Sequence, residues 1–278
     1  MAGDKILIFR DLEYGDKKHA ELGWTSWLAA FSKVDGSQIW RTDWKGTCCT
    51  YSTPIVVERD GRDQIIIGAS PKILGFDLET GEQLWSVDYP AVQVVPSPVI
   101  ADDLLIVSGA VHDRLTAAFR LTGGGSETVL EPLWESNRAV PEIASPVLYD
   151  NTLYQVTEGG VATATQAETG NYIKHWRLKL GPYRASMIAG DGKVYALSAR
   201  GTVAVISKAP GPELIAENQM PVDTGPYLAM SASADCLLVR SRRALYCVDG
   251  YEPEPEPATD SADATDATDA APEAPNPS

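Results

Sequence analysis

The adjacent pair Cys48 and Cys49 has the most unusual potential chemistry in this chain. Neighbouring cysteines can form a vicinal disulfide, whose geometry is strained and uncommon. The pair lies in a segment before Ser52-Thr53-Pro54, and we expect two ordinary small loop residues there rather than a functional disulfide. The remaining cysteines, Cys236 and Cys247, show no C-x-x-C spacing and have no nearby His. Because zinc sites need such spacing, we expect no zinc here.

Other patterns of catalytic residues do not appear in the sequence. His19, His112 and His175 are isolated from one another, and none belongs to an H-E-x-x-H or H-x-x-x-H pattern. The run 123–125 is glycine-rich but lacks the Lys-Ser/Thr of a phosphate loop, so we interpret it as a flexible insertion. No G-x-S-x-G segment is present. The sequence therefore predicts no catalytic residues, no metal site and no resident cofactor.

Acidic residues dominate the charge of the chain, and many of them lie at its end. The net charge is −15, and residues 252–278 contribute eight acids without a Lys or Arg. Taking these eight from the 38 acids leaves 30 against 23 bases, a balance of −7. Because nucleic-acid binding needs a basic surface, we expect no nucleic-acid partner. The one basic cluster, Arg240, Arg242 and Arg243, suits a solvated strand edge.

No segment approaches the roughly 18 consecutive apolar residues that a membrane-spanning helix needs. The N-terminal residues contain an apolar run from Ile6 to Phe9 only, which does not match a secretory signal. Residues 251–278 cycle through Glu-Pro and then Ala, Thr and Asp. Low hydrophobicity combined with high net charge predicts a disordered acidic tail there.

A glycine followed four residues later by a tryptophan recurs through the rest of the chain. The tryptophans are Trp40, Trp85, Trp134 and Trp176, with Ala216 in the equivalent place of a fifth copy, and the glycines are Gly36, Gly81 and Gly170. The fourth copy has two extra residues in this spacing, and the third has a longer insertion instead of the glycine. The interval of 40 to 49 residues lies in the range of propeller blades. We expect each ring to wedge against the neighbouring repeat and to bury roughly 150–250 Å².

The first half of each repeat predicts β-structure. Segments of the type Ser-Pro-Val begin near Pro54, Pro98 and Pro146, where a proline at a strand start costs no ladder hydrogen bond. Short Val-, Ile- and Leu-rich runs follow, separated by Asp-Gly, Asp-Asn or Asp-Asp, which is typical of hairpin turns. A four-stranded antiparallel unit used about six times predicts an all-β propeller.

The segment Asp77-Leu-Glu-Thr80-Gly81-Glu-Gln-Leu-Trp85, with the Ser-Pro-Val halves, resembles the tryptophan-docking repeat of PQQ-like β-propellers. The resemblance extends from about residue 4 to 249. It predicts a propeller over residues 1–250, followed by the tail at 251–278. Complete repeats fall at about 53–88, 97–137, 145–180 and 186–220, with partial ones at 4–44 and 227–249.

Propellers of this family usually have seven or eight blades, so two interpretations of the six visible repeats remain open. The chain is an N-terminally shortened piece of a longer propeller, or it closes as a ring of six with thin end blades. The first interpretation is preferred because the first unit begins at its second strand, near Lys5.

The resemblance also suggests functions from two classes. Quinoprotein dehydrogenases of the family carry pyrroloquinoline quinone and calcium, and place a disulfide of adjacent cysteines against the quinone; Cys48 and Cys49 match that feature alone. The BamB-like branch consists of cofactor-free scaffolds of the outer-membrane assembly machinery, which the single-Trp repeats match better. We expect a non-catalytic scaffold that binds proteins through loops on the propeller faces, in an extracytoplasmic location. A ligand-binding propeller without turnover is a third hypothesis, and neither the partner nor the oligomeric state follows from the sequence.

Overall fold

The computed structural model describes residues 2–11, 25–45, 47, 50–91, 93–109, 114–179, 181–221, 226–233 and 236–249. The regular structure of these residues is β, apart from the short 3-10 helix η1 (Gly125–Glu127). The predicted acidic tail, Cys48, Cys49, His19 and His112 lie outside the described residues.

Four sheets each contain four antiparallel strands, paired in the order of the chain. The second sheet consists of β4 (Ile55–Arg59), β5 (Arg62–Gly68), β6 (Lys72–Asp77) and β7 (Gln83–Asp88). The third consists of β8 (Val99–Ala101), β9 (Leu104–Gly109), β10 (Leu115–Thr122) and β11 (Val129–Ser136). The fourth consists of β12 (Val147–Tyr149), β13 (Thr152–Val156), β14 (Val161–Gln166) and β15 (Tyr172–Arg177). The fifth consists of β16 (Ile188–Gly190), β17 (Lys193–Leu197), β18 (Thr202–Ser207) and β19 (Leu214–Gln219).

The first and sixth sheets have three described strands each. The first contains β1 (Lys5–Arg10), β2 (Ser26–Ser32) and β3 (Gln38–Trp44), and the sixth contains β20 (Tyr227–Ser233), β21 (Cys236–Ser241) and β22 (Leu245–Asp249). In the first sheet Trp40 pairs with Ala30, as Trp85 pairs with Gly75 in the second, so its strands correspond to the second, third and fourth of a full sheet. In the sixth sheet β20 is the counterpart of a first strand.

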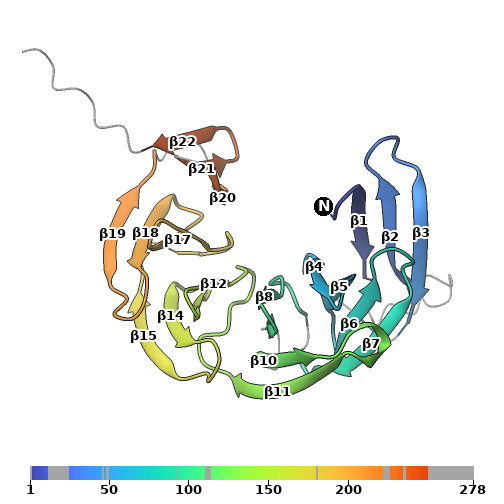
Figure 1. Cartoon of the computed structure of the whole chain (residues 1–278). Coiled ribbons are helices and arrows are strands. Elements are labelled where there is room, and N and C mark those ends of the chain that lie inside the picture. The colour runs from blue at the N-terminus through green and yellow to red at the C-terminus, as the bar shows by residue number, and fades with distance from the viewer. Residues whose placement is uncertain are drawn as a thin grey trace, which may run out of the picture.

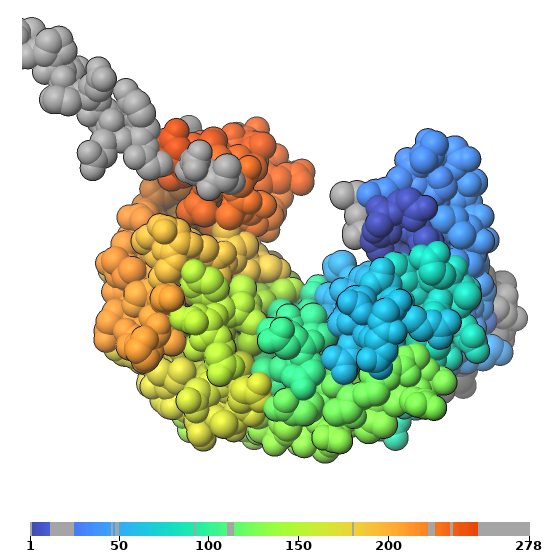
Figure 2. All heavy atoms as spheres, in the orientation of Figure 1, coloured from blue at the N-terminus to red at the C-terminus, as the bar shows by residue number. Residues whose placement is uncertain are grey.

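The six sheets follow one another around an open arc, with β4, β8 and β12 toward its inside and β3, β7, β11, β15 and β19 along its outside (Figure 1). The first and sixth sheets lie at the two ends of the arc. A wide opening separates them, and the space-filling view shows the same opening (Figure 2). The repeat count predicted from the sequence therefore corresponds to six sheets in a ring that is not closed by the described residues.

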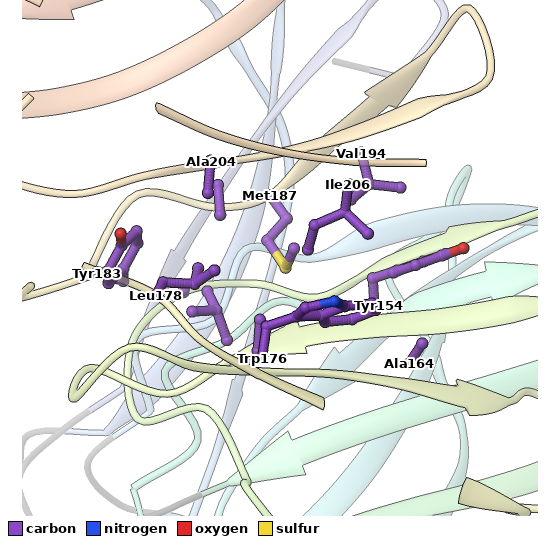
Figure 3. Close-up of a cluster of buried hydrophobic side chains, with 13 residues drawn as sticks. Tyr154, Ala164, Trp176, Leu178, Tyr183, Met187, Val194, Ala204 and Ile206 are labelled. Carbon is purple, nitrogen blue, oxygen red and sulfur yellow. The ribbon is translucent and has the colours of Figure 1, made fainter. Parts of the chain in front are cut away.

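The core consists of layers between neighbouring sheets rather than one central cluster. The layer between the fourth and fifth sheets combines Tyr154 and Trp176 with Met187, Val194 and Ile206, all of them buried (Figure 3). Four further clusters fill the other junctions of the arc. Each interior sheet is therefore buried on both faces, which explains why runs such as Ile65-Ile66-Ile67 have no polar alternation.

The hairpins between first and second strands have the backbone that their sequences predict. Asp60 and Gly61 have φ angles of 51° and 75°, and Asp191 and Gly192 have φ angles of 50° and 69°. Both central residues of a type I′ turn need a positive φ, which Gly adopts without strain and which Asp and Asn tolerate better than other residues.

The residue before each strand-initial proline links one sheet to the next. The backbone N–H of Thr53 donates to Ser97 Oγ at 3.1 Å, and that of Ser97 donates to Ser145 Oγ at 3.0 Å. The N–H of Ser145 donates in turn to Ser186 Oγ at 3.2 Å. This serine ladder, formed by Thr53, Ser97, Ser145 and Ser186, gives the Ser of the Ser-Pro motif a role between sheets. Four successive sheets are thereby joined near their innermost strands.

Replacing Ser145 with alanine should remove the acceptor for the partly buried N–H of Ser97. We expect a loss of about 1 kcal/mol in the free energy of unfolding, measured by urea denaturation, because a lost hydrogen bond of this kind costs that amount. Ser231→Ala is the control, since Ser231 is exposed on β20, and should change stability by less than about 0.5 kcal/mol. Equal effects of the two substitutions would contradict a structural role for the ladder.

Candidate functional site

Trp40 contacts the turn that joins β6 to β7 in the neighbouring sheet. Its indole Nε1 donates to the backbone oxygen of Leu78 at 3.0 Å. The ring lies over Gly81, where an added Cβ would come within 2.4 Å of a ring carbon. Gly81 also has a φ of 73°, so both its backbone and the space above it favour glycine.

An aspartate organises this turn. Asp77 Oδ1 accepts the backbone N–H groups of Glu79 at 2.9 Å and Thr80 at 2.8 Å, and the N–H of Gly81 donates to the Asp77 carbonyl at 2.9 Å. Burial works to raise the pKa of Asp77, but the hydrogen bonds from Thr80 and Glu79 and the charge of Arg62 outweigh it and lower the pKa below its ordinary value. The carboxylate therefore stays ionised and holds the carbonyl of Leu78 toward the indole.

Trp134 repeats this contact between the third and fourth sheets. Its Nε1 donates to the backbone oxygen of Ala167 at 2.7 Å. A Cβ on Gly170, whose φ is 70°, would lie 2.7 Å from the ring. We propose that these two indole–glycine contacts hold neighbouring sheets together.

The other two predicted tryptophans are placed differently. Trp85 donates to Gln64 Oε1 of its own sheet at 2.9 Å, and its ring covers Gly75 of its own sheet. The third sheet has the 123–127 insertion where a Thr-Gly turn would stand, and this insertion forms η1 and contacts β7. Trp176 is buried in the layer of Figure 3, and its Nε1 has no acceptor among the described residues.

Gly36 occupies the same kind of turn in the first sheet, with no ring over it. Its N–H donates to the Ser32 carbonyl at 2.9 Å and its φ is 74°, as at Gly81. No described atom lies within 4 Å of the position that a Cβ would take. The three predicted glycines thus share one backbone geometry, and two of them are covered by tryptophan.

A hollow of about 240 Å³ lies beside the Trp134 contact, between the third and fourth sheets. Its lining residues are Trp134, Ser136, Arg138, Gln155, Thr163, Thr165, Gly170 and Tyr172. The Arg138 guanidinium carbon lies 4.8 Å from the centroid of the Tyr172 ring, which places a cation over an aromatic face. No ion pair joins Arg138 to a carboxylate of the described residues.

Gln155, one of the polar residues that line this hollow, is buried and hydrogen-bonded to the third sheet. Gln155 Nε2 donates to Thr116 Oγ1 at 2.9 Å and to Ser108 Oγ at 3.3 Å. Sequence reasoning missed Arg138 and Tyr172 as site residues. In the sequence, the strands β12, β13 and β14 separate Arg138 from Tyr172. The two residues come together only because the third and fourth sheets stack.

The remaining candidates from the sequence do not gather into one site. His175 lies on β15 and is hydrogen-bonded to the hydroxyl of Tyr172. Cys236 is half-buried and Cys247 is exposed. Arg240 lies on β21, and Arg242 and Arg243 are in the turn that follows it.

The described residues contain neither a cluster of metal ligands nor a membrane-spanning helix. No three or more His, Cys, Asp or Glu side chains in the described part are grouped as a metal site would need. No helix in that part is long and apolar enough to cross a membrane.

Stacked four-stranded antiparallel sheets around an arc, each joined to the next by its face, define the β-propeller class. A family profile described as outer membrane protein assembly factor BamB matches residues 25–249. The chain belongs to this PQQ-like, BamB-like repeat family. No curated protein sequence matches it significantly.

Solved structures of propellers resemble the chain in fold. BamB from Moraxella catarrhalis superposes with a TM-score of 0.63 at 14% identity, over 87% of this chain and 68% of that one. Hsv2 from Kluyveromyces lactis gives 0.55 at 14% identity, over 77% and 70% of the two chains. The computationally designed protein Ika8 gives 0.59 at 11% identity, over 86% and 65%. At these identities the likeness concerns the fold alone.

Substitution of Gly170 by alanine tests the indole–glycine contact. The methyl group would meet the Trp134 ring in addition to straining a φ of 70°, so we expect a loss of about 2–4 kcal/mol in urea denaturation. Gly192→Ala is the matched control, because Gly192 has a φ of 69° and open space around it; it should cost about 1 kcal/mol. Equal losses at the two positions would show that the indole adds nothing.

Proposed function

We propose that this chain is a non-catalytic, BamB-like scaffold that binds protein partners, and that the hollow beside Trp134 is one of its binding surfaces. The observation that carries this proposal is the composition of the hollow. Trp, Tyr and Arg are the residues that contribute most to binding energy in protein interfaces, and Trp134, Tyr172 and Arg138 line this one hollow.

The chemistry of the hollow specifies the kind of group it would take. The Arg138 guanidinium carbon lies over the Tyr172 ring, and no described carboxylate forms an ion pair with Arg138. Arginine in this arrangement favours a carboxylate, which it can bind through two parallel hydrogen bonds. We therefore expect a partner segment with an Asp or Glu that reaches Arg138 and an apolar side chain that packs on Trp134.

The family supports a role in the cell envelope. Its profile is described as an outer membrane protein assembly factor. As part of the proposal, we place this chain outside the cytoplasm and expect its partner to belong to an outer-membrane assembly complex. Loops on the propeller faces remain predicted as further contact surfaces.

Binding to purified soluble domains of outer-membrane assembly subunits tests the proposal. We expect one of them to bind the immobilised chain, and the double variant Arg138→Ala/Tyr172→Ala to weaken that binding at least tenfold, because both side chains belong to the predicted contact. The control is Arg200→Ala/Tyr51→Ala, which removes an exposed Arg and an exposed Tyr away from the hollow. Equal binding by both double variants would contradict the assignment of the surface.

A second test with the purified chain distinguishes a scaffold from a dehydrogenase. Mixed with pyrroloquinoline quinone and calcium, a scaffold should gain neither bound quinone absorbance nor oxidation of alcohols or sugars. A gain of both would overturn the proposed function and would direct attention to Cys48 and Cys49.

A further inference from the structure

The first sheet exposes a face that is buried in the next sheet of the arc. Ile6 pairs with Phe31 in β1 and β2, and Ile65 pairs with Phe76 in the same register of β5 and β6. Ile65 and Phe76 are both 0% exposed. Ile6, by contrast, is 40% exposed, and Phe31 is only half-buried.

The next pair of residues along the same strands shows the same difference. Ile8 pairs with Ala29 in the first sheet, as Ile67 pairs with Leu74 in the second. Ile8 is 45% exposed, whereas Ile67 is 0% exposed. In the second sheet these positions are covered by the first sheet, through Leu7, Phe9, Trp40 and Trp44. The free face of the first sheet, formed by Ile6, Ile8 and Phe31, therefore corresponds to the face that the second sheet buries against the first.

The turn beside this free face is a tryptophan-docking turn without a tryptophan. Gly36 matches Gly81 and Gly170 in φ and in its hydrogen bond, and no atom of the described residues lies within 4 Å of the position of an added Cβ. The carbonyl that accepts an indole belongs to Leu78 in the second sheet and to Ala167 in the fourth, and Lys33 occupies this position in the first.

The backbone of that turn already has the hydrogen bonding of the two turns that accept an indole. The N–H of Lys33 donates to the Asp4 carbonyl at 3.0 Å. The N–H groups of Leu78 and Ala167 make the corresponding bonds, to Asp63 at 3.0 Å and Asn151 at 3.1 Å. A preformed site loses little entropy on binding.

We propose that the first sheet binds, on its free face, a β-strand from a separate polypeptide that carries a solvent-accessible tryptophan. The indole covers Gly36 and donates its N–H to the carbonyl oxygen of Lys33. The apolar neighbours of the tryptophan contact Ile6, Ile8 and Phe31. This surface is independent of the hollow beside Trp134, so the inference stands apart from the proposed function.

A second copy of this chain is a poorer occupant than a different protein. Trp40 and Trp134 already cover glycines of their own chain, and Trp85 and Trp176 are buried. Trp44 stacks on Phe9 at 5.9 Å between centroids, and Arg41 lies 4.8 Å from the Trp27 ring. The outer strand β19 carries Ala216 in place of tryptophan, and β20, β21 and β22 contain none. No tryptophan of the described residues is therefore available to fill the site at Gly36.

A peptide copied from a tryptophan-bearing strand of this chain provides the probe. The ten residues 81–90, which include Trp85, would be labelled with a fluorophore and titrated with the full chain while anisotropy is recorded. We expect saturable binding, and at least tenfold weaker binding of the same peptide with alanine in place of tryptophan.

Variants of the chain show whether the peptide binds at the predicted place. Gly36→Asn keeps the left-handed backbone, which Asn tolerates, and fills the space for the indole, so binding should fall at least tenfold. Gly192→Asn introduces the same side chain at a φ of 69° away from the free face and should bind as the wild type does. Ile8→Asp should also weaken binding, whereas Leu245→Asp, at an exposed site on the sixth sheet, should not.

Three results would overturn the inference. They are peptide binding that does not depend on its tryptophan, binding that persists unchanged in Gly36→Asn, and self-association of the wild type in sedimentation that Gly36→Asn abolishes. The last result would identify a second copy as the occupant in place of a different protein.

Discussion

The stacking of one sheet face on the next is the constraint on which this structure depends. A four-stranded sheet of mainly Val, Ile and Leu cannot expose both faces to water, and each interior sheet here is covered on both. Two kinds of polar contact fix the stacked sheets relative to each other. The serine ladder joins them near the inner strands, and the contacts of Trp40 and Trp134 with the neighbouring turns join them near the outer strands. The repeat therefore conserves the contacts between neighbouring sheets as well as the fold of each sheet.

Much of this could be predicted because the repeat uses residues with narrow backbone requirements. Gly81 and Gly170 need a positive φ, Asp-Gly pairs need type I′ turns, and the sequence shows both directly. The acceptor atoms could not be predicted, since Leu78 and Ala167 contribute backbone oxygens that no side-chain type reveals. Trp85 shares the position of Trp40 in the repeat but not its partner, because the third sheet lacks the Thr-Gly turn. Trp176 lies two residues beyond the counterpart of Trp40, because Lys174 takes that place opposite Ala164 while Trp176 pairs with Ala162. Arg138 and Tyr172 were missed because their proximity arises only when two sheets stack.

Both surfaces that we assign to partners lie at a turn whose glycine can be covered by an indole. At Gly170 the turn is covered by Trp134, which also forms one wall of the hollow lined by Arg138 and Tyr172. At Gly36 no ring of the described residues covers the turn, and Ile6 and Ile8 on the same sheet are exposed. In both proposals, binding and architecture use one set of interactions, namely those of an indole with a glycine turn.

A double-mutant cycle between Trp134 and Gly170 measures the central interaction most directly. The free energy of unfolding would be determined for the wild type, Trp134→Ala, Gly170→Ala and the double variant. Because the alanine methyl group clashes only when the indole is present, the account predicts a coupling energy of about 1 kcal/mol or more, with Gly170→Ala costing less once Trp134 is removed. Additive losses, within about 0.5 kcal/mol, would contradict the claim that the indole and the glycine join the two sheets.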